Sequence, residues 1–110
     1  SLRRQRQMCK ETDLVDPHKL GYNTCTYVGV RLEKGSLYRE AARQLELIPE
    51  VVECHFTTGQ YDMLIKMYAH DNEHLLHLIH EKLQPLGLLR TETLVSFREV
   101  FSRALPVGND

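Results

Sequence analysis

A glycine-centred turn carries the residues best suited to chemistry, with Gly59 followed by Gln60, Tyr61 and Asp62. Glycine permits the positive φ angle that brings successive backbone N–H groups to one side, and such a concavity suits a carboxylate. Asp62 offers an acceptor for an ammonium group. Together these groups predict a site for a zwitterion such as a free amino acid. From spacing alone, a plain hairpin turn with a charged edge fits the same residues.

Four of the six histidines recur at spacings of three and four residues, which places them along one side of a helix: His70, His74, His77 and His80. Imidazoles one helical turn apart can chelate a metal, but this stripe has no cysteine or carboxylate partner. We therefore expect a solvated face opposite the leucines. A further alternative is a pH-dependent assembly contact, because protonation near about pH 6 would add positive charge.

No pattern in the sequence is typical of catalysis. There is no glycine-rich phosphate loop, no Gly-x-Ser-x-Gly motif and no evident nucleophile beside a base. His55 has the chemistry of a general base, but a strand histidine that faces a helix or an interface fits better. The sequence therefore predicts no catalytic residue, no metal ligand and no cofactor.

The chain has 110 residues, which suffices for one domain with a single core while much of its surface stays exposed. Its net charge of −1 argues against a chain-wide nucleic-acid surface. No run approaches the roughly 20 apolar residues that a membrane helix needs, and the first residues do not resemble a secretory signal. We therefore expect a cytoplasmic protein with no membrane partner.

The three cysteines are Cys9, Cys25 and Cys54, which are odd in number and lack Cys-x-x-Cys spacing. This arrangement indicates neither a disulfide framework nor a zinc site. Cys25 and Cys54 lie inside strand-like segments, where we expect them to be small buried hydrophobic residues.

Two kinds of periodicity alternate along the chain. Alternating runs rich in Thr, Tyr and Val predict strands at residues 22–33, 51–57, 61–69 and 88–97. A first helix is predicted from Ser36, its N-cap, to Ile48, and a second from a cap on Asp71 or Asn72 to about residues 85–87. The buried stripe of the first helix is predicted to comprise Tyr38, Ala41, Ala42, Leu45 and Ile48.

The order of these elements, βαββαβ, predicts an α+β ferredoxin-like sandwich, a four-stranded antiparallel sheet with two helices on one face. Apolar residues also lie on the face that the helices leave open, namely Cys25, Tyr27, Leu64, Tyr68 and Leu94. An apolar patch of this size favours a second subunit as its cover, so we expect a dimer with the two sheets facing each other. The alternative cover is the chain's own first 20 residues or its tail.

The two ends of the chain are predicted to lie outside the sandwich. Residues 1–20 read as a linker remnant, although a basic arm for DNA phosphates is the alternative for its first ten residues. The domain proper is predicted at 21–107, with 108–110 as a short tail. Val100, Phe101 and Leu105 keep the end of the domain apolar, which suggests that this stretch docks on something.

Four motifs, taken together and in this order, resemble the Lrp/AsnC transcription regulators, the feast/famine family. They are LVDPHKLGY at 14–22, IPEVVECH at 48–55, TTGQYDMLIK at 57–66 and TET at 91–93. The resemblance covers about residues 14–106 and implies the C-terminal effector-binding domain of that family, the RAM domain, with a ferredoxin-like fold. It also implies dimers that pair through their sheets, associate into tetramers, octamers or higher rings, and bind an amino acid between dimers.

The resemblance further implies that the effector pocket surrounds the turn and the facing fourth strand. The matching residues are Thr58, Gly59, Gln60, Tyr61, Asp62, Glu92 and Thr93. From their chemistry we expect the effector carboxylate at the N–H groups of the turn and the effector side chain against Tyr61. The ammonium group is expected at Asp62 or Glu92.

Full-length members of the family carry a helix-turn-helix before the linker, and residues 1–13 are too short to form one. We therefore expect contact with DNA only through a helix-turn-helix that this chain lacks, whether the chain begins inside the linker or is a stand-alone domain. The leading prediction is a regulatory domain without enzymatic activity. The alternative is an enzyme, because tetrapyrrole-modifying decarboxylases resemble this family and similar dimeric folds host monooxygenases.

Overall fold

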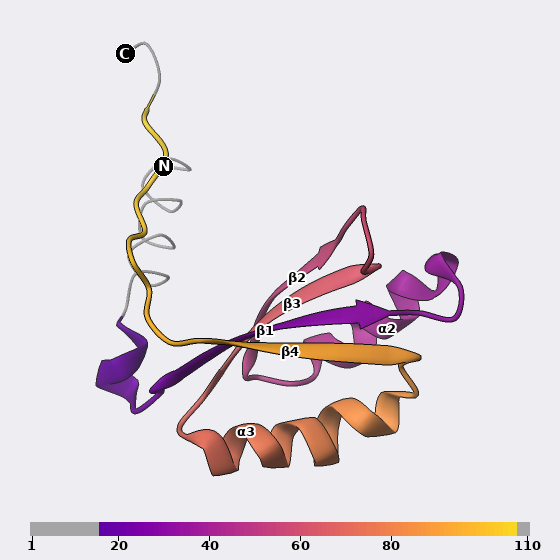
Figure 1. Cartoon of the computed structure of the whole chain (residues 1–110), viewed down its shortest axis with the longest axis horizontal. Helices are drawn as coiled ribbons and strands as arrows, with labels where there is room; N and C mark the ends of the chain where they lie inside the picture. Colours follow the sequence, from indigo (N-terminus) through magenta and orange to yellow (C-terminus); the bar gives the residue numbers. More distant parts are fainter. Residues whose placement is uncertain (1–15, 108–110) are drawn as a thin grey trace, which may run out of the picture.

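Strands and helices follow one another in the predicted βαββαβ order (Figure 1). The computed structural model describes residues 16–107. The strands are β1 (Thr24–Arg31), β2 (Val51–Phe56), β3 (Met63–Ala69) and β4 (Arg90–Ser96). The helices are α2 (Tyr38–Glu46) and α3 (Asn72–Leu78), and α3 continues through a π-helical turn (Ile79–Leu83) and a 3₁₀ turn (Gln84–Leu86). Two further 3₁₀ turns cover Pro17–Leu20 and Gly35–Leu37.

The strands form one antiparallel sheet in the order β2-β3-β1-β4. β1 and β3 are neighbours in the centre of the sheet although α2 and β2 separate them in the sequence. α2 and α3 are the crossover connections, whereas a turn joins β2 directly to β3. This arrangement confirms the predicted ferredoxin-like sandwich of the α+β class.

Both helices pack on the same face of the sheet, and the core lies between them and the central strands. Alternate residues of a strand point to the same face, so Val28 and Val30 of β1 and Ile65 and Met67 of β3 are completely buried there. Leu45 of α2 is equally buried. The rest of the buried apolar cluster comprises Leu32, Ala41, Ile48, Met63, Ala69, Leu75, Leu78 and Leu83.

The two helices begin in different ways. Asp71 caps α3, as one of the two predicted alternatives required, because its Oδ1 accepts the His74 N–H at 2.8 Å. The prediction that Ser36 caps the first helix is wrong. Ser36 lies inside the 3₁₀ turn Gly35–Leu37, so α2 begins only after Leu37, which makes no side-chain capping bond.

Each strand is shorter than its sequence pattern predicted. The alternation of apolar and polar residues continues for one or two residues beyond each strand. The strand itself ends where its backbone pairing with the neighbouring strand ends. At the two ends of the β1–β4 pair, Cys25 lies opposite Ser96 and Arg31 lies opposite Arg90. Beyond these pairs the chain turns away to the connecting segments.

No described element covers the other face of the sheet, here called the open face. Register places the five predicted residues on it: Cys25 lies opposite Tyr68, Tyr27 lies opposite Leu94, and Leu64 lies opposite Gly29. The Lys66 ammonium sits among the aromatic rings, with Nζ 5.9 Å from the centroid of Tyr27 and 5.5 Å from that of Tyr68.

The segment after β4 leaves the end of the strand and runs away from the sheet (Figure 1). It has no regular secondary structure, and its large apolar side chains are exposed, Phe97 completely so. The exposed members of this apolar tail are Phe97, Val100, Phe101, Leu105 and Val107. Among residues 16–107, no helix has the length and apolar character needed to cross a membrane.

Candidate functional site

The turn between β2 and β3 is fixed by hydrogen bonds at several points. Thr57 closes it, because its N–H donates to the Asp62 carbonyl at 2.9 Å and its hydroxyl donates to the Tyr61 carbonyl at 3.0 Å. From β1, Arg31 Nη1 donates to the Gln60 carbonyl at 2.6 Å. Gly59 has a φ of 99°, the left-handed conformation that favours glycine. The predicted glycine turn is therefore present and held in one shape.

Tyr61 lies across the open face of β1. A Cβ atom placed on Gly29 would come within 2.8–2.9 Å of the Tyr61 ring, so only glycine lets the ring rest on the strand. At the far end of the ring, the Tyr61 hydroxyl donates a hydrogen bond to Glu92 Oε1 on β4. This bond holds the phenolic proton and raises the pKa of Tyr61 above its usual range.

A hollow of about 580 Å³ opens beside this tyrosine, where β1 ends and β4 begins. Its charged groups are two guanidinium groups, Arg31 and Arg90, and one carboxylate, Glu92. Leu89 provides an apolar contact, and the remaining lining residues are Gln60 and Tyr61. The hollow therefore offers both signs of charge, one apolar surface and one aromatic ring to a small polar ligand.

The structure brings three of the seven predicted site residues together in this hollow, namely Gln60, Tyr61 and Glu92. Thr58 and Gly59 lie at the exposed tip of the turn and do not line it. Thr93 lies opposite Val28, so it points to the helix-covered face, whereas its neighbour Glu92 points to the open face.

Asp62 also lies outside the hollow, and besides the bond from Thr57 to its carbonyl it contacts the end of β1. Its Oδ2 accepts the Leu32 N–H at 2.7 Å, and its own N–H donates to the Val30 carbonyl at 2.8 Å. The side chain thereby extends the β1–β3 pairing beyond the end of both strands. At least one carboxylate oxygen of Asp62 is thus committed to the fold.

Sequence reasoning missed the two arginines, Leu89 and the supporting glycine. A glycine inside a strand signals the close approach of another group, and Gly29 could have been interpreted in that way. Arg31 and Arg90 had no such signal, because only the β1–β4 register places them opposite each other.

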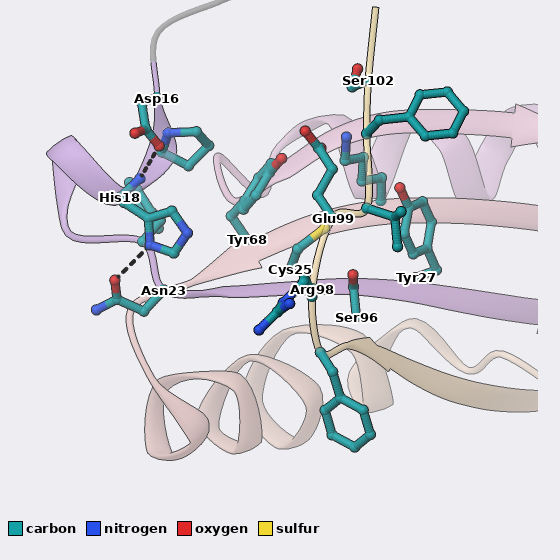
Figure 2. A pocket seen from close by; sticks show the side chains of 16 residues that line it. Asp16, His18, Asn23, Cys25, Tyr27, Tyr68, Ser96, Arg98, Glu99 and Ser102 are labelled. Atoms are coloured by element: carbon teal, nitrogen blue, oxygen red, sulfur yellow. Dashed lines mark hydrogen bonds between the residues drawn. The ribbon is translucent and has the colours of Figure 1, made fainter.

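A second hollow, of about 450 Å³, lies at the other end of the open face (Figure 2). Its floor is formed by Cys25, Tyr27, Lys66 and Tyr68, and the root of the apolar tail forms one side. Burial raises the pKa of the Cys25 thiol, which therefore stays protonated and a poor nucleophile at neutral pH.

The histidine stripe is largely solvated, as predicted, because His70, His77 and His80 are exposed, whereas His74 is half-buried. The His70 ring stacks on Tyr22 at 4.2 Å and on His74 at 4.9 Å between centroids. His74 is half-buried, with Nε2 3.3 Å from Glu50 Oε2 and Nδ1 accepting the His70 N–H. The start of α3 lies against the segment before β1, which explains this packing; His77 and His80 are exposed as predicted.

Other predicted chemistry has these outcomes. In the part of the chain that the structure describes, no three His, Cys, Asp or Glu side chains are grouped to hold a metal. His55 contacts Glu53, with Nε2 3.0 Å from Oε1.

Cys25 is half-buried, but Cys54 is exposed, against expectation, because β2 is an edge strand that α2 covers only in part. Cys9 lies outside the described residues.

Comparison with known proteins identifies relatives of the whole described sandwich. The model of the Lrp/AsnC ligand binding domain matches residues 25–106. Regulatory protein AsnC of Haemophilus influenzae is 33% identical over 91 residues, which cover 82% of this chain and 61% of the relative. The transcriptional regulator FL11 of Pyrococcus furiosus is 34% identical over 86 residues, covering 78% of this chain and 56% of the relative.

Solved structures agree with the sequence relatives. AsnC of Escherichia coli superposes with a TM-score of 0.79 at 32% identity, covering 83% of this chain and 62% of that chain. A Neisseria meningitidis transcriptional regulator, solved with L-methionine, has a TM-score of 0.79 at 19% identity and covers 97% and 75%. The latter similarity concerns the fold alone.

The matches cover most of this chain but only part of each AsnC relative. The chain spans about three fifths of the length of the AsnC relatives that it matches. The family model covers most of the chain, from the first residues of β1 to the apolar tail. The chain therefore belongs to the Lrp/AsnC family and corresponds to its ligand binding domain.

Proposed function

We propose that this chain is the effector-binding and oligomerisation domain of a transcription regulator and that its effector is an amino acid. The observation that carries the proposal is the hollow at the turn, where guanidinium groups and a carboxylate face one cavity beside an aromatic ring. A free amino acid presents the complementary pair of charges on a small body. Relatives named as regulators, and a solved regulator bound to L-methionine, support the same function.

Within the hollow, each part of an amino acid has a partner. Glu92 is the acceptor for the ammonium group, because its Oε2 has no hydrogen-bond partner among residues 16–107 while Oε1 holds Tyr61. The carboxylate is bound by the guanidinium group of Arg31, which is anchored at the turn, with the exposed N–H groups of the turn as a second donor set. Asp62 acts by positioning the turn, because its Oδ2 is bonded to the Leu32 N–H.

Assembly follows from the open face. Each copy carries one open face and one apolar tail. A second copy related by a two-fold axis would cover both surfaces at once, giving a homodimer. The hollow lies at the end of the sheet, so further association of dimers into tetramers or octamers would place a neighbouring subunit beside it. An effector then favours one assembly by binding it more tightly than another.

In the whole regulator, DNA would be bound by a helix-turn-helix outside this chain, and the cytoplasm is the compartment where such a protein would act. The relatives named above are regulators. No feature of the described residues favours the alternative of an enzyme that acts on tetrapyrroles or oxygen.

A thermal-shift screen of the twenty standard amino acids, followed by calorimetry and light scattering with any hit, tests the proposal. We expect at least one amino acid to raise the melting temperature and to change the assembly size. Glu92→Gln should weaken binding by about tenfold or more, because a charge-assisted bond is lost. The comparison variant Asp62→Asn keeps the acceptor for Leu32 N–H and should bind normally.

Two results would contradict the proposal. If no amino acid bound while a tetrapyrrole produced a haem-like absorbance, the chain would be an enzyme or carrier of that cofactor class. If Asp62→Asn abolished binding and Glu92→Gln did not, the assignment of the ammonium group to Glu92 would be wrong.

A further inference from the structure

Two arginines face each other at the end of the open face. Arg31 and Arg90 are directly opposed in the β1–β4 register, and both line the hollow beside Tyr61. Like charges in opposed positions of a sheet are destabilising. Neither guanidinium forms a salt bridge within residues 16–107. The hollow therefore holds two positive charges against the single carboxylate of Glu92.

The two guanidinium groups differ in whether a hydrogen bond within the protein holds them in place. Arg31 is anchored, because Nη1 donates to the Gln60 carbonyl at 2.6 Å. The guanidinium of Arg90 forms no hydrogen bond within the described residues, so its planar fork is available for a bidentate contact with a carboxylate. Arg90 is thus the group best able to recognise an added acidic function on a ligand.

The charges of the hollow can be matched one by one. The hollow holds two guanidinium groups and one carboxylate, Glu92. A neutral amino acid pairs its ammonium group with Glu92 and its carboxylate with one arginine, and it leaves the second arginine unpaired. An amino acid with an acidic side chain supplies the missing partner.

We propose that the hollow selects acidic amino acids, aspartate or glutamate, over their amides, and that Arg90 is the residue that makes this selection. The proposal rests on the proposed function and adds the chemical class of its ligand. Asparagine and glutamine have nearly the same shape as the two acids but lack the charge. Discrimination between acid and amide therefore isolates the contribution of the second guanidinium.

The same chemistry would be available to simpler anions, and Glu92 distinguishes them. The carboxylate of Glu92 repels inorganic phosphate. It offers no favourable contact to a dicarboxylate that lacks an amino group, such as succinate. It attracts the ammonium group of an amino acid. Both simple anions should accordingly bind more weakly than aspartate and glutamate.

Calorimetry on the full chain tests the proposal with six probes: L-aspartate, L-glutamate, L-asparagine, L-glutamine, succinate and inorganic phosphate. Of the two acids, we expect the one that binds more tightly to have a dissociation constant at least about tenfold lower than that of its amide. This preference should decrease as the salt concentration is raised. Arg90→Gln should remove the preference for the acid while leaving amide binding nearly unchanged. Arg43→Gln, the same change on the exposed surface of α2, should leave both unchanged.

The possible failures separate the two proposals. If an amide or another neutral amino acid bound as tightly as the acids, the selection would be refuted and the amino-acid-binding function would stand. If no amino acid bound at all, both would fail. If phosphate or succinate bound as tightly as the acids, or if Arg43→Gln acted like Arg90→Gln, the effect would be general electrostatic attraction and the selection would be refuted.

Discussion

The two faces of the sheet are built from the same strands but differ in what they are used for. On β3, buried and half-buried residues alternate without exception from Met63 to Ala69. The buried set packs under α2 and α3, whereas the other set, which includes Leu64 and Tyr68, looks out from the open face. One face holds the single copy together, and the other carries the hollow with Tyr61 and Glu92 and the surface proposed for pairing.

The contrast extends to the kind of side chain on each face. Among residues 16–107, the one buried polar residue is Thr26, and it lies on the helix-covered face among apolar neighbours. The open face mixes aromatic rings with Lys66, Arg31 and Glu92, which suit contacts that form and break in water. The comparison teaches that stability and binding can be altered separately in this protein.

The largest expected effect comes from a matched pair of leucines on the two faces. Leu45→Ala removes a completely buried side chain of α2 and should lower the free energy of unfolding by about 2–5 kcal/mol. Leu94→Ala makes the same change on the open face, where the leucine is 48% exposed, and should cost about 1 kcal/mol or less in a single copy. Urea denaturation followed by circular dichroism measures both.

Repeating the denaturation at several protein concentrations distinguishes Leu45→Ala from Leu94→Ala more clearly. The cost of Leu45→Ala should not depend on concentration, whereas that of Leu94→Ala should grow at high concentration, because a dimer through the open face would bury Leu94. Equal and concentration-independent costs for both variants would break the distinction between the faces.

A smaller effect is expected where the site rests directly on a strand. Gly29→Ala would put a methyl group within 2.9 Å of the Tyr61 ring and should cost about 1–3 kcal/mol of stability. The displaced ring would also lose its bond to Glu92, so effector affinity should fall. Denaturation and calorimetry of the same samples give both numbers.

A double-mutant cycle provides the control for this clash. If the methyl group acts through the ring, Gly29→Ala should cost much less stability in a Tyr61→Ala background. An unchanged cost would mean that the glycine is required by the strand backbone and not by the tyrosine.

The sequence predicted what depends on local pattern and missed what depends on register. Alternation in the strands and the apolar stripe around Leu45 were sufficient for the βαββαβ order and the helix-covered core. The N-cap at Ser36 was wrong because a 3₁₀ turn takes up that residue. The helical pattern of the histidine stripe could not show that His70 stacks on Tyr22, about 50 residues earlier in the chain, or that His74 lies beside Glu50.

The candidate site follows the same rule. The turn and Tyr61 could be found from a motif, since they are contiguous in the sequence. The pairing of Arg31 with Arg90, and the support of Tyr61 by Gly29, arise only when strands from different parts of the chain come together. For the same reason, Thr93 and Glu92 are neighbours in sequence but lie on opposite faces.

The smallest effect is expected at the polar edge of the open face, where Glu53 lies between His55 and Lys66. The hydrogen bond with His55 is the main reason that the pKa of Glu53 lies below its usual value. A lowered pKa in the folded state stabilises the protein above the unfolded value of about 4.3, and this contribution disappears as the pH falls through the folded value. Because the group is about half exposed, it should contribute less than about 1 kcal/mol. Denaturation of wild type and Glu53→Gln should therefore show a small deficit in the variant near neutral pH that vanishes in acid, and His55→Gln should reduce it; a deficit that persisted in acid would show that the glutamate acts through packing instead of charge.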